Sequence, residues 1–214
     1  MAQRKRPNAV LPARALPTPR GATEGERVEA GVSLVGPGDT DTLDYILSHI
    51  RSVPDFPSPG ILFRDITPLL ASPRCFHIVL DAIAHRFVGE NISAVVGVES
   101  RGFIFGGALA ARLNASFVPV RKAGKLPSST DRVSYSLEYG EAELEMHRDA
   151  LVEDSEVLIV DDLLATGGTA AAAAELVERQ GANVHAFAFV IELAGLEGRA
   201  RLEGYPVISV VRYA

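Results

Sequence analysis

The sequence predicts an α/β fold built on a doubly wound, mostly parallel sheet. From residue 94 onward, short runs of branched apolar residues recur, and such runs are typical of strands buried on both faces. Segments with small or helically spaced apolar residues separate several of them, and strands that alternate with helices form parallel sheets. Ligands of such sheets bind at the carboxyl ends of the strands. The expected strands are residues 94–98, 117–120, 157–160, 184–191 and 207–210.

Composition limits the class of protein. A chain of 214 residues, 47% of them hydrophobic, is long enough to bury one core, so we expect one folded domain. The net charge is −6, but residues 1–38 hold six of the 21 basic and three of the 27 acidic residues. The remainder therefore has 15 basic and 24 acidic residues, a net charge of −9. Such an acidic body argues against a nucleic-acid partner.

Cysteine usage and hydropathy bear on location. The single cysteine, Cys75, cannot form an intrachain disulfide and favours a reducing, cytoplasmic setting. No apolar run approaches the roughly 20 residues of a membrane-spanning helix, so no membrane association is expected. One cysteine and five scattered histidines offer no zinc-site spacing, and we expect no metal held directly by the protein.

The first 38 residues differ in character from the rest. They are rich in Arg, Pro, Ala and Gly, which predicts a disordered N-terminal extension. No apolar segment follows the basic residues 4–6, so a secretory signal is not expected. Apolar side chains at positions 43, 46, 47 and 50 then share one helix face. The folded domain is therefore expected to span residues 39–214.

Residues 39–70 are expected to form a small N-terminal hood. Its second part, residues 53–70, contains four prolines, which fix φ and keep the backbone extended. Backbone groups near Leu62, Phe63 and Arg64 would then be held out for a ligand. A proline-rich connector would explain the same pattern, and this stretch alone does not decide between the two.

A helix, a strand and a polar turn follow. Ser72 and Pro73 mark the start of a helix with an apolar stripe through Phe87. The strand at 94–98 leads into Glu99-Ser100-Arg101-Gly102 and then into a helix of small residues at 103–113. Arg101 is a forked donor that matches phosphate oxygens. Alternatively, it is an ordinary surface arginine beside a capping serine.

A basic loop and a flap come after the strand at 117–120. Arg121, Lys122 and Lys125 lie within five residues, beside a glycine, and three such cations suit a pyrophosphate group. Apolar and polar residues then alternate until an acid-rich stretch at 141–145. We therefore expect a flexible two-stranded flap over about residues 126–146.

The central feature is the segment after the strand at 157–160. Asp161 and Asp162 stand where that strand should end, and the chain turns through residues 165–169 into an alanine-rich helix. Gly167, Gly168 and the helix start would present N–H groups to an anion. The turn is neither a Walker A nor a dinucleotide loop, because it lacks the lysine of the first and the G-x-G-x-x-G of the second. An ordinary turn with Thr169 as N-cap is the alternative.

The domain is expected to end with a helix near residues 196–202 and a strand at 207–210 that closes the sheet.

Residues 157–169 resemble the 5-phosphoribosyl-1-pyrophosphate (PRPP) motif of the type I phosphoribosyltransferases. Further segments match in the same order, and together they resemble the adenine phosphoribosyltransferase family from about residue 43 to the C-terminus. These segments are residues 54–60 with 63–65, 100–102, 121–127 and 134–140. The resemblance implies a homodimeric enzyme of purine salvage that converts adenine and PRPP into AMP and pyrophosphate. Magnesium would be carried in on the PRPP.

The resemblance also implies roles for residues that bind PRPP or AMP. Asp161 and Asp162 would hold the ribose hydroxyls. Arg101 and a lysine of the basic loop, often from the neighbouring subunit, would contact pyrophosphate, with Lys122 and Lys125 as candidates. Tyr139 would join this site from the flap. The 5-phosphate would be bound by Ala165, Thr166, Gly167, Gly168 and Thr169.

For the purine, the resemblance places Glu138 on the flap as general acid/base, and Arg101 beside it as the second catalytic residue. Phe63 would stack on the adenine ring, with Leu193 opposite. Backbone groups from Leu62 to Arg64 would read the adenine edge.

Two departures from this assignment stay open. One is another phosphoribosyltransferase, for xanthine, hypoxanthine and guanine, or orotate, against which the proline-rich segment weighs. The other is a non-catalytic, PRPP-sensing regulator that binds nucleic acid, against which the acidic body and the flap weigh. Glu99 stands where the family often has Asp, and binding should not suffer because Arg101 makes the contact.

Overall fold

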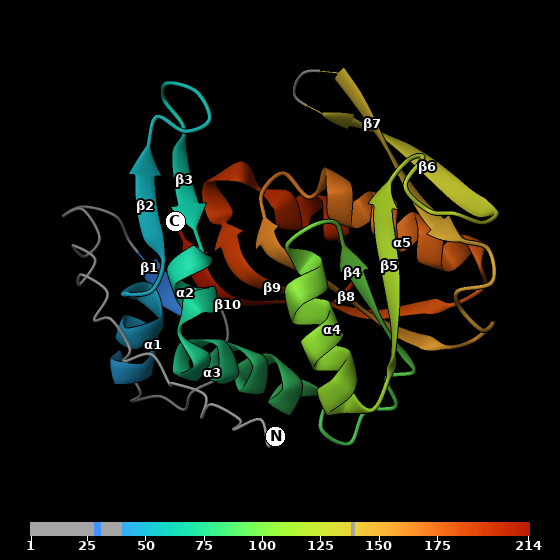
Figure 1. Ribbon diagram of the computed structural model, residues 1–214, viewed down its shortest axis with the longest axis horizontal. Helices are drawn as coiled ribbons and strands as arrows, with labels where there is room; N and C mark the ends of the chain where they lie inside the picture. Colours follow the sequence, from blue (N-terminus) through green and yellow to red (C-terminus); the bar gives the residue numbers. More distant parts are fainter. Residues whose placement is uncertain (1–27, 31–39, 138–139) are drawn as a thin grey trace, which may run out of the picture.

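The computed structural model describes residues 28–30, 40–137 and 140–214 (Figure 1). Its centre is an eight-stranded sheet in the order β1-β10-β9-β8-β4-β5-β7-β6. Five adjacent strands run parallel, which confirms the predicted mostly parallel sheet. They are β10 (Val207–Tyr213), β9 (Asn183–Leu193), β8 (Glu156–Leu164), β4 (Ala94–Val98) and β5 (Ser116–Lys122).

Helices cover both faces of this sheet. Helices α3 (Pro73–Ala84) and α4 (Gly102–Leu113) pack on one face, and α5 (Gly168–Arg179) packs on the other. Successive strand residues alternate between the two cores, so Leu158 joins the α3/α4 side and Ile159 the α5 side. This is the doubly wound arrangement expected from the alternation of strand and helix patterns. The 3₁₀ helix η1 (His85–Phe87) continues α3.

The β2–β3 hairpin of an N-terminal hood and a two-stranded flap extend from the sheet toward the same side of the molecule, the top of Figure 1. The hood contains α1 (Thr40–Leu47), the antiparallel pair β2 (Arg51–Pro54) and β3 (Leu62–Asp65), and α2 (Thr67–Ala71). The flap is the antiparallel pair β6 (Thr130–Leu137) and β7 (Gly140–His147). Strand β7 also pairs with the end of β5, so the flap continues the main sheet.

The structure corrects three expectations. The segment near 196–202 is not an α-helix but two 3₁₀ helices, η2 (Ala194–Leu196) and η3 (Gly198–Leu202). Strand β8 continues past the acidic pair to Leu164, because β9 pairs with it along that length. Strand β10 is not the edge of the sheet, since β1 (Val28–Ala30) pairs antiparallel with it.

Strand β1 also bears on the predicted N-terminal extension. Its three residues belong to the segment that the composition assigned to disorder, and a three-residue strand is too short to leave a periodic signal in the sequence. The rest of residues 1–38 lies outside the described part of the protein. Within the described ranges, no helix is both long and apolar enough to cross a membrane.

Candidate active site

A polar cavity of about 440 Å³ lies where β4, β5 and β8 end and the flap begins. The carboxyl ends of parallel strands meet there, so residues far apart in the sequence face one space. The cavity brings together five of the predicted residues: Arg101, Lys122, Asp161, Asp162 and, from the start of α5, Thr169. Its full lining is Glu99, Ser100, Arg101, Lys122, Tyr135, Ala142, Leu144, Asp161, Asp162 and Thr169.

The acidic pair is held by its neighbours. The Oδ1 of Asp161 accepts a hydrogen bond from the Asp162 N–H at 2.8 Å, and the Nε of Arg101 lies 2.7 Å from Asp162 Oδ2. Burial, followed by the charge of Asp162, raises the pKa of Asp161 well above its ordinary value. Burial also raises the pKa of Asp162, against the opposing charge of Arg101. Two adjacent carboxylates with raised pKa values are typical of a ligand site.

Asp161→Asn is therefore expected to stabilise the ligand-free protein while it weakens ligand binding. The folded-state pKa of Asp161 lies above its unfolded value, so the ionised form costs stability at neutral pH. Asparagine keeps the acceptor for the Asp162 N–H without the charge. We expect the free energy of unfolding at pH 7.5, measured in denaturant, to rise by about 1 kcal/mol.

This gain in the free energy of unfolding should shrink as the pH falls through the raised pKa of Asp161. Wild-type Asp161 then takes up a proton, and the folded wild type no longer contains the destabilising charge. A variant less stable than wild type at pH 7.5 would contradict the conclusion that ionised Asp161 destabilises the folded protein.

The loop between β8 and α5 encloses a second, smaller cavity of about 80 Å³. Gly167 has φ +79°, a conformation that favours glycine, and α5 begins at Gly168. The N-cap is Gly167, so the alternative prediction that Thr169 caps the helix is wrong. The predicted residues Ala165, Thr166, Gly167, Gly168 and Thr169 all line this cavity. A helix N-terminus with glycine backbone around a cavity of this size suits one phosphate group.

Backbone from a distant segment supports this loop from behind. A Cβ atom added to Gly167 would lie 2.4 Å from the carbonyl oxygen of Gly198 in η3. A Cβ atom added to Gly198 would lie 2.2 Å from the carbonyl oxygen of Ala165. Segment η3 is itself tied to β9, because Arg199 donates from Nε and from an Nη atom to the buried carboxylate of Glu192, both at 2.7 Å. The sequence did not indicate the contact of Gly198 with the loop, because a single glycine is compatible with many kinds of turn and loop.

Arg121 and Lys122 are the last two residues of β5, which continues past the predicted end at residue 120, and they and Lys125 of the following loop are organised by Glu99. Its carboxylate accepts hydrogen bonds from Arg121 at 3.2 Å, from Lys125 Nζ at 2.5 Å and from the backbone N–H of Lys122 at 3.2 Å. Burial opposes ionisation of Glu99, but the donors Lys125 and Arg121 lower its pKa to about 2. From the sequence, Glu99 was expected only to replace the family's Asp without an effect on binding. In the structure its carboxylate has three hydrogen-bond partners, Arg121, Lys122 and Lys125.

The flap reaches the phosphate loop through Tyr135. The Thr169 hydroxyl donates to the Tyr135 hydroxyl at 3.3 Å, and both residues line the large cavity. The predicted residues Glu138 and Tyr139 lie outside the described residues.

The hood meets the cavity at Arg101. The Arg101 guanidinium carbon lies 5.4 Å from the centre of the Phe63 ring, and Phe56 packs edge-on against the same ring at 5.1 Å. Leu62 is exposed beside it, while Arg64 is buried and packs over the Tyr213 ring at 3.9 Å. Leu193, at the end of β9, packs against the hydrophobic core and pairs with Tyr213 in the sheet. The stacking of adenine between Phe63 and Leu193 stays a prediction.

Comparison with known proteins agrees with this geometry. Residues 66–210 match the family model described as "Phosphoribosyl transferase domain". A crystal structure of adenine phosphoribosyltransferase from Rhodothermus marinus superposes with a TM-score of 0.77 at 52% identity, over 80% of this protein and 98% of that one. The fold and the site therefore define a type I phosphoribosyltransferase.

Curated relatives narrow this class. The adenine phosphoribosyltransferase of Sorangium cellulosum is 66% identical over 177 residues, which cover 80% of this sequence and 88% of that protein. The corresponding protein of Methylococcus capsulatus is 55% identical over 171 residues, which cover 80% of this sequence and all of that protein. The protein belongs to the adenine phosphoribosyltransferase family.

Proposed function

We propose that this enzyme transfers the 5-phosphoribosyl group of PRPP to N9 of adenine, giving AMP and pyrophosphate for purine salvage. The observation that carries this is the pairing of two adjoining cavities: residues 165–169 line the small one, which suits one phosphate, and the acidic pair, Arg101 and Lys122 line the large one. Family membership supports the same reaction, and the comparisons give no support to a xanthine, hypoxanthine or guanine enzyme or to a regulator.

Each part of the cavity has a chemical task in this reaction. The loop N–H groups would hold the 5-phosphate, and Asp161 and Asp162 would accept hydrogen bonds from the ribose hydroxyls. The bond from C1′ to pyrophosphate breaks as positive charge builds on the ribose, and adenine N9 attacks the opposite face. Arg101, Lys122 and Lys125 would stabilise the negative charge on the departing pyrophosphate. Glu138 would manage the purine proton from the flap.

We propose that magnesium enters as a complex with PRPP. The substrate phosphates would supply oxygen ligands of the kind that magnesium prefers, while Asp161 and Asp162, which line the cavity, would remain with the ribose hydroxyls. Within the described ranges, no group of three or more His, Cys, Asp or Glu residues could hold the ion by itself. Magnesium would supply charge neutralisation at the leaving pyrophosphate.

Adenine selectivity would arise at the hood. In the described part of the protein, β3 pairs only with β2, so its other edge has no strand partner. Backbone carbonyl and N–H groups along that edge, near Phe63, match the N6 donor and N1 acceptor of adenine. Hypoxanthine and guanine invert this pattern and would leave buried groups unpaired.

We therefore expect kcat/KM for adenine to exceed that for hypoxanthine, guanine or xanthine by at least about 10²-fold. Pyrophosphate release measured with each base at saturating magnesium and PRPP tests this directly. Titration of magnesium-loaded PRPP in a calorimeter serves as the control, since binding of PRPP should not depend on the base. Comparable rates with hypoxanthine would remove the adenine assignment, and absence of heat with PRPP would remove the transferase assignment.

We also propose a homodimer. The surface formed by α4 and β5 exposes Ile104 and Phe117, whose exposed fractions are 42% and 37%, and Phe103 packs edge-on against Phe117. Apolar side chains gathered on neighbouring elements suit a second copy of the protein. Light scattering should give about twice the monomer mass of 22.8 kDa, and a monomer at micromolar concentration would contradict this. A cytoplasmic location stays a prediction that rests on the free cysteine Cys75.

A further inference from the structure

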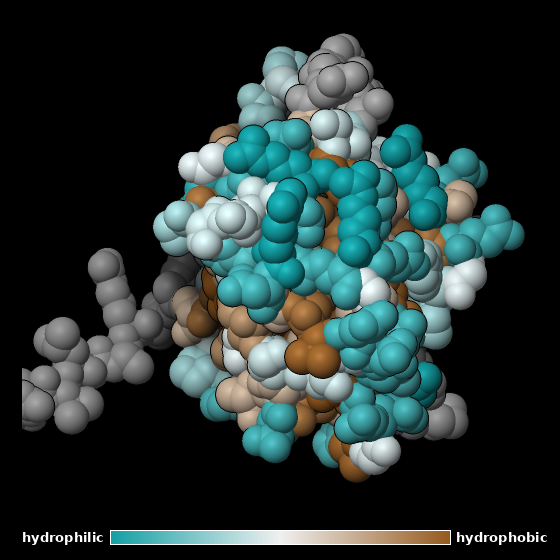
Figure 2. All heavy atoms as spheres, turned by 90° about the vertical axis from the view of Figure 1, so that its right-hand side faces the viewer, coloured by the Kyte–Doolittle hydropathy of each residue, from teal (hydrophilic) through white to brown (hydrophobic). Residues whose placement is uncertain are grey.

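A buried carboxylate lies at the base of the flap. Glu145 on β7 has an exposed fraction of 0%, yet it lies at the junction of the flap and the basic loop. The surface around the flap is largely hydrophilic in its upper half (Figure 2). Other charged residues there are exposed to solvent, whereas Glu145 is buried. Burying a charge is costly unless hydrogen bonds compensate. Its burial therefore requires a specific set of partners.

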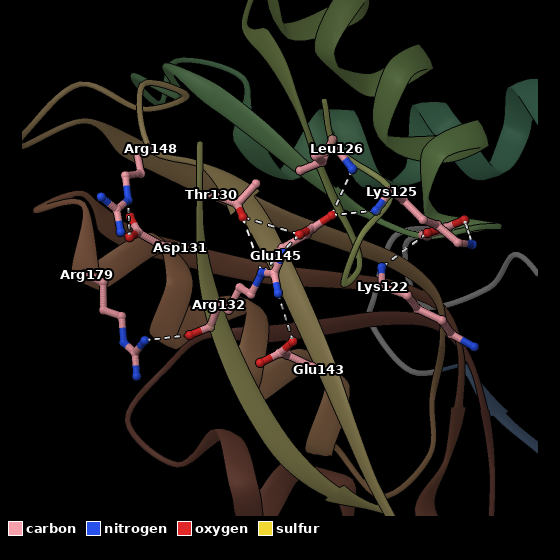
Figure 3. Close-up of polar contacts among 11 residues, drawn as sticks. Lys122, Lys125, Leu126, Thr130, Asp131, Arg132, Glu143, Glu145, Arg148 and Arg179 are labelled. Carbon is pink, nitrogen blue, oxygen red and sulfur yellow. Dashed lines mark hydrogen bonds and ion pairs between the residues drawn. The ribbon is translucent and has the colours of Figure 1, made fainter. Parts of the chain in front are cut away.

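Glu145 has these partners, and two of them are backbone N–H groups of the basic loop (Figure 3). Its Oε1 accepts from the N–H of Lys125 at 2.7 Å and from that of Leu126 at 2.8 Å. Its Oε2 lies 3.3 Å from both the Thr130 hydroxyl and Arg132 Nε. Burial opposes ionisation, but the loop N–H groups lower the pKa of Glu145, so the residue stays an anion at neutral pH.

Lys125 is consequently held at both ends by carboxylates from different elements. Its N–H is bound by Glu145 of β7, and its Nζ is bound by Glu99 at the end of β4. Lys122, which lines the large cavity, is the last residue of β5 and leads directly into this loop. At the other end of the loop, the N–H of Leu126 donates to the same oxygen atom of Glu145. One oxygen atom of Glu145 thus binds two successive N–H groups of the loop, in addition to the contacts that Glu99 makes with Arg121, Lys122 and Lys125.

We infer that Glu145 is a positioning residue for pyrophosphate binding: its carboxylate holds the loop that follows the cavity residue Lys122, through Leu126, in the conformation that positions Lys122 and Lys125 for the pyrophosphate. Glu145 touches neither the cavity nor the substrate and acts through Lys125. Because it belongs to β7, it also makes the basic loop and the flap one unit. This inference rests on the proposed function, since it names pyrophosphate as the group that the loop binds.

Three variants test the inference. Glu145→Leu keeps the volume but accepts no hydrogen bond. Glu145→Gln keeps an oxygen that both loop N–H groups can use. Glu143→Leu is the matched control, because Glu143 lies on the same strand and shares the partner Arg132 at 3.6 Å, but its side chain is 39% exposed and does not line the cavity. Affinity for magnesium pyrophosphate is measured by calorimetry, and amide hydrogen exchange is followed at Lys125 and Leu126.

For Glu145→Leu we expect pyrophosphate affinity to fall about tenfold or more, because two partly buried backbone donors lose their acceptor. The amides of Lys125 and Leu126 should exchange at least about tenfold faster. KM for adenine should change less than about twofold, because the lost hydrogen bonds lie at Lys125 and Leu126, whereas Phe63 belongs to the separate two-stranded sheet of the hood. Glu145→Gln should stay within about threefold of wild type in all three measurements, and Glu143→Leu should match wild type.

Wild-type pyrophosphate affinity in Glu145→Leu, unchanged amide exchange, or an equal loss in Glu143→Leu would overturn the inference. If Glu145→Leu does not fold, Glu145→Gln decides. A fall of more than about tenfold in its pyrophosphate affinity would show that an oxygen acceptor for the two loop N–H groups is not sufficient, and would contradict the inference. Failure of wild type to bind pyrophosphate or PRPP would instead contradict the proposed function, and the exchange of the loop amides would still report on Glu145.

Discussion

Gly198→Ala should reduce affinity for PRPP by about 10²-fold, although Gly198 is far from the phosphate loop in sequence. The added Cβ would lie 2.2 Å from the carbonyl oxygen of Ala165 and 3.0 Å from a methyl group of Leu164. Rotation of the Leu164 side chain alone does not relieve the clash, because the closer contact is with backbone. Either η3 or the phosphate loop must move, and Arg199 ties η3 to Glu192. The phosphate loop should therefore shift.

The measurement is calorimetric titration of magnesium-loaded PRPP, with KM for PRPP as a second readout. Gly195→Ala is the matched control, since Gly195 lies three residues earlier, in η2, and a Cβ there would meet nothing within 4 Å. That variant should bind PRPP as wild type does. Equal affinities for Gly198→Ala and wild type, in a folded protein, would show that η3 does not position the phosphate loop.

Glu138→Gln should lower kcat by about 10² to 10⁴-fold while affinity for PRPP stays within a few-fold of wild type. Glutamine is close in size but can neither accept the purine proton as a base nor return it as an acid. Phosphate and ribose binding depend on residues 161–169 and should be unaffected. The rate of pyrophosphate release at saturating adenine, together with a PRPP titration, separates the two effects.

Glu143→Gln is the control for this experiment, because it removes another flap carboxylate whose side chain does not line the cavity. It should retain nearly full turnover. A Glu138→Gln variant with wild-type kcat would assign the proton transfer to another group, and one that loses PRPP binding would indicate a role in holding the ribose rather than in catalysis.

Much of the fold could be predicted because local sequence and tertiary structure agree. Residues 94–98 are apolar on both faces, and they form the central strand β4 at those bounds. Ser72 caps α3 as expected, with its hydroxyl accepting from the Cys75 N–H at 3.3 Å. The errors fall where local signals are weak. Segment η3 has a helical composition but forms only 3₁₀ turns, and β1 is too short for periodicity to indicate it.

The candidate site divides in the same way. Residues 161–169 are consecutive, so their pattern indicated an anion site and the family resemblance added the ribose, and the structure places them around two adjoining cavities. Arg101 and Lys122 were predicted from their chemistry, and the structure brings both to the larger cavity. Glu145 was seen only as one acid in an acid-rich strand, because its partners come from a loop 20 residues away.

The sequence by itself determined the alternation of strands and helices, the phosphate loop and the family, since each is carried by residues close together along the polypeptide. Only the tertiary structure decided which groups support that loop and fix the basic residues. Gly198 touches Ala165, and Glu145 binds the N–H of Lys125, through contacts between segments that meet only after the sheet has formed. Hydrogen bonding and steric exclusion act over a few ångströms in space, and spacing along the sequence does not encode which distant atoms will come that close.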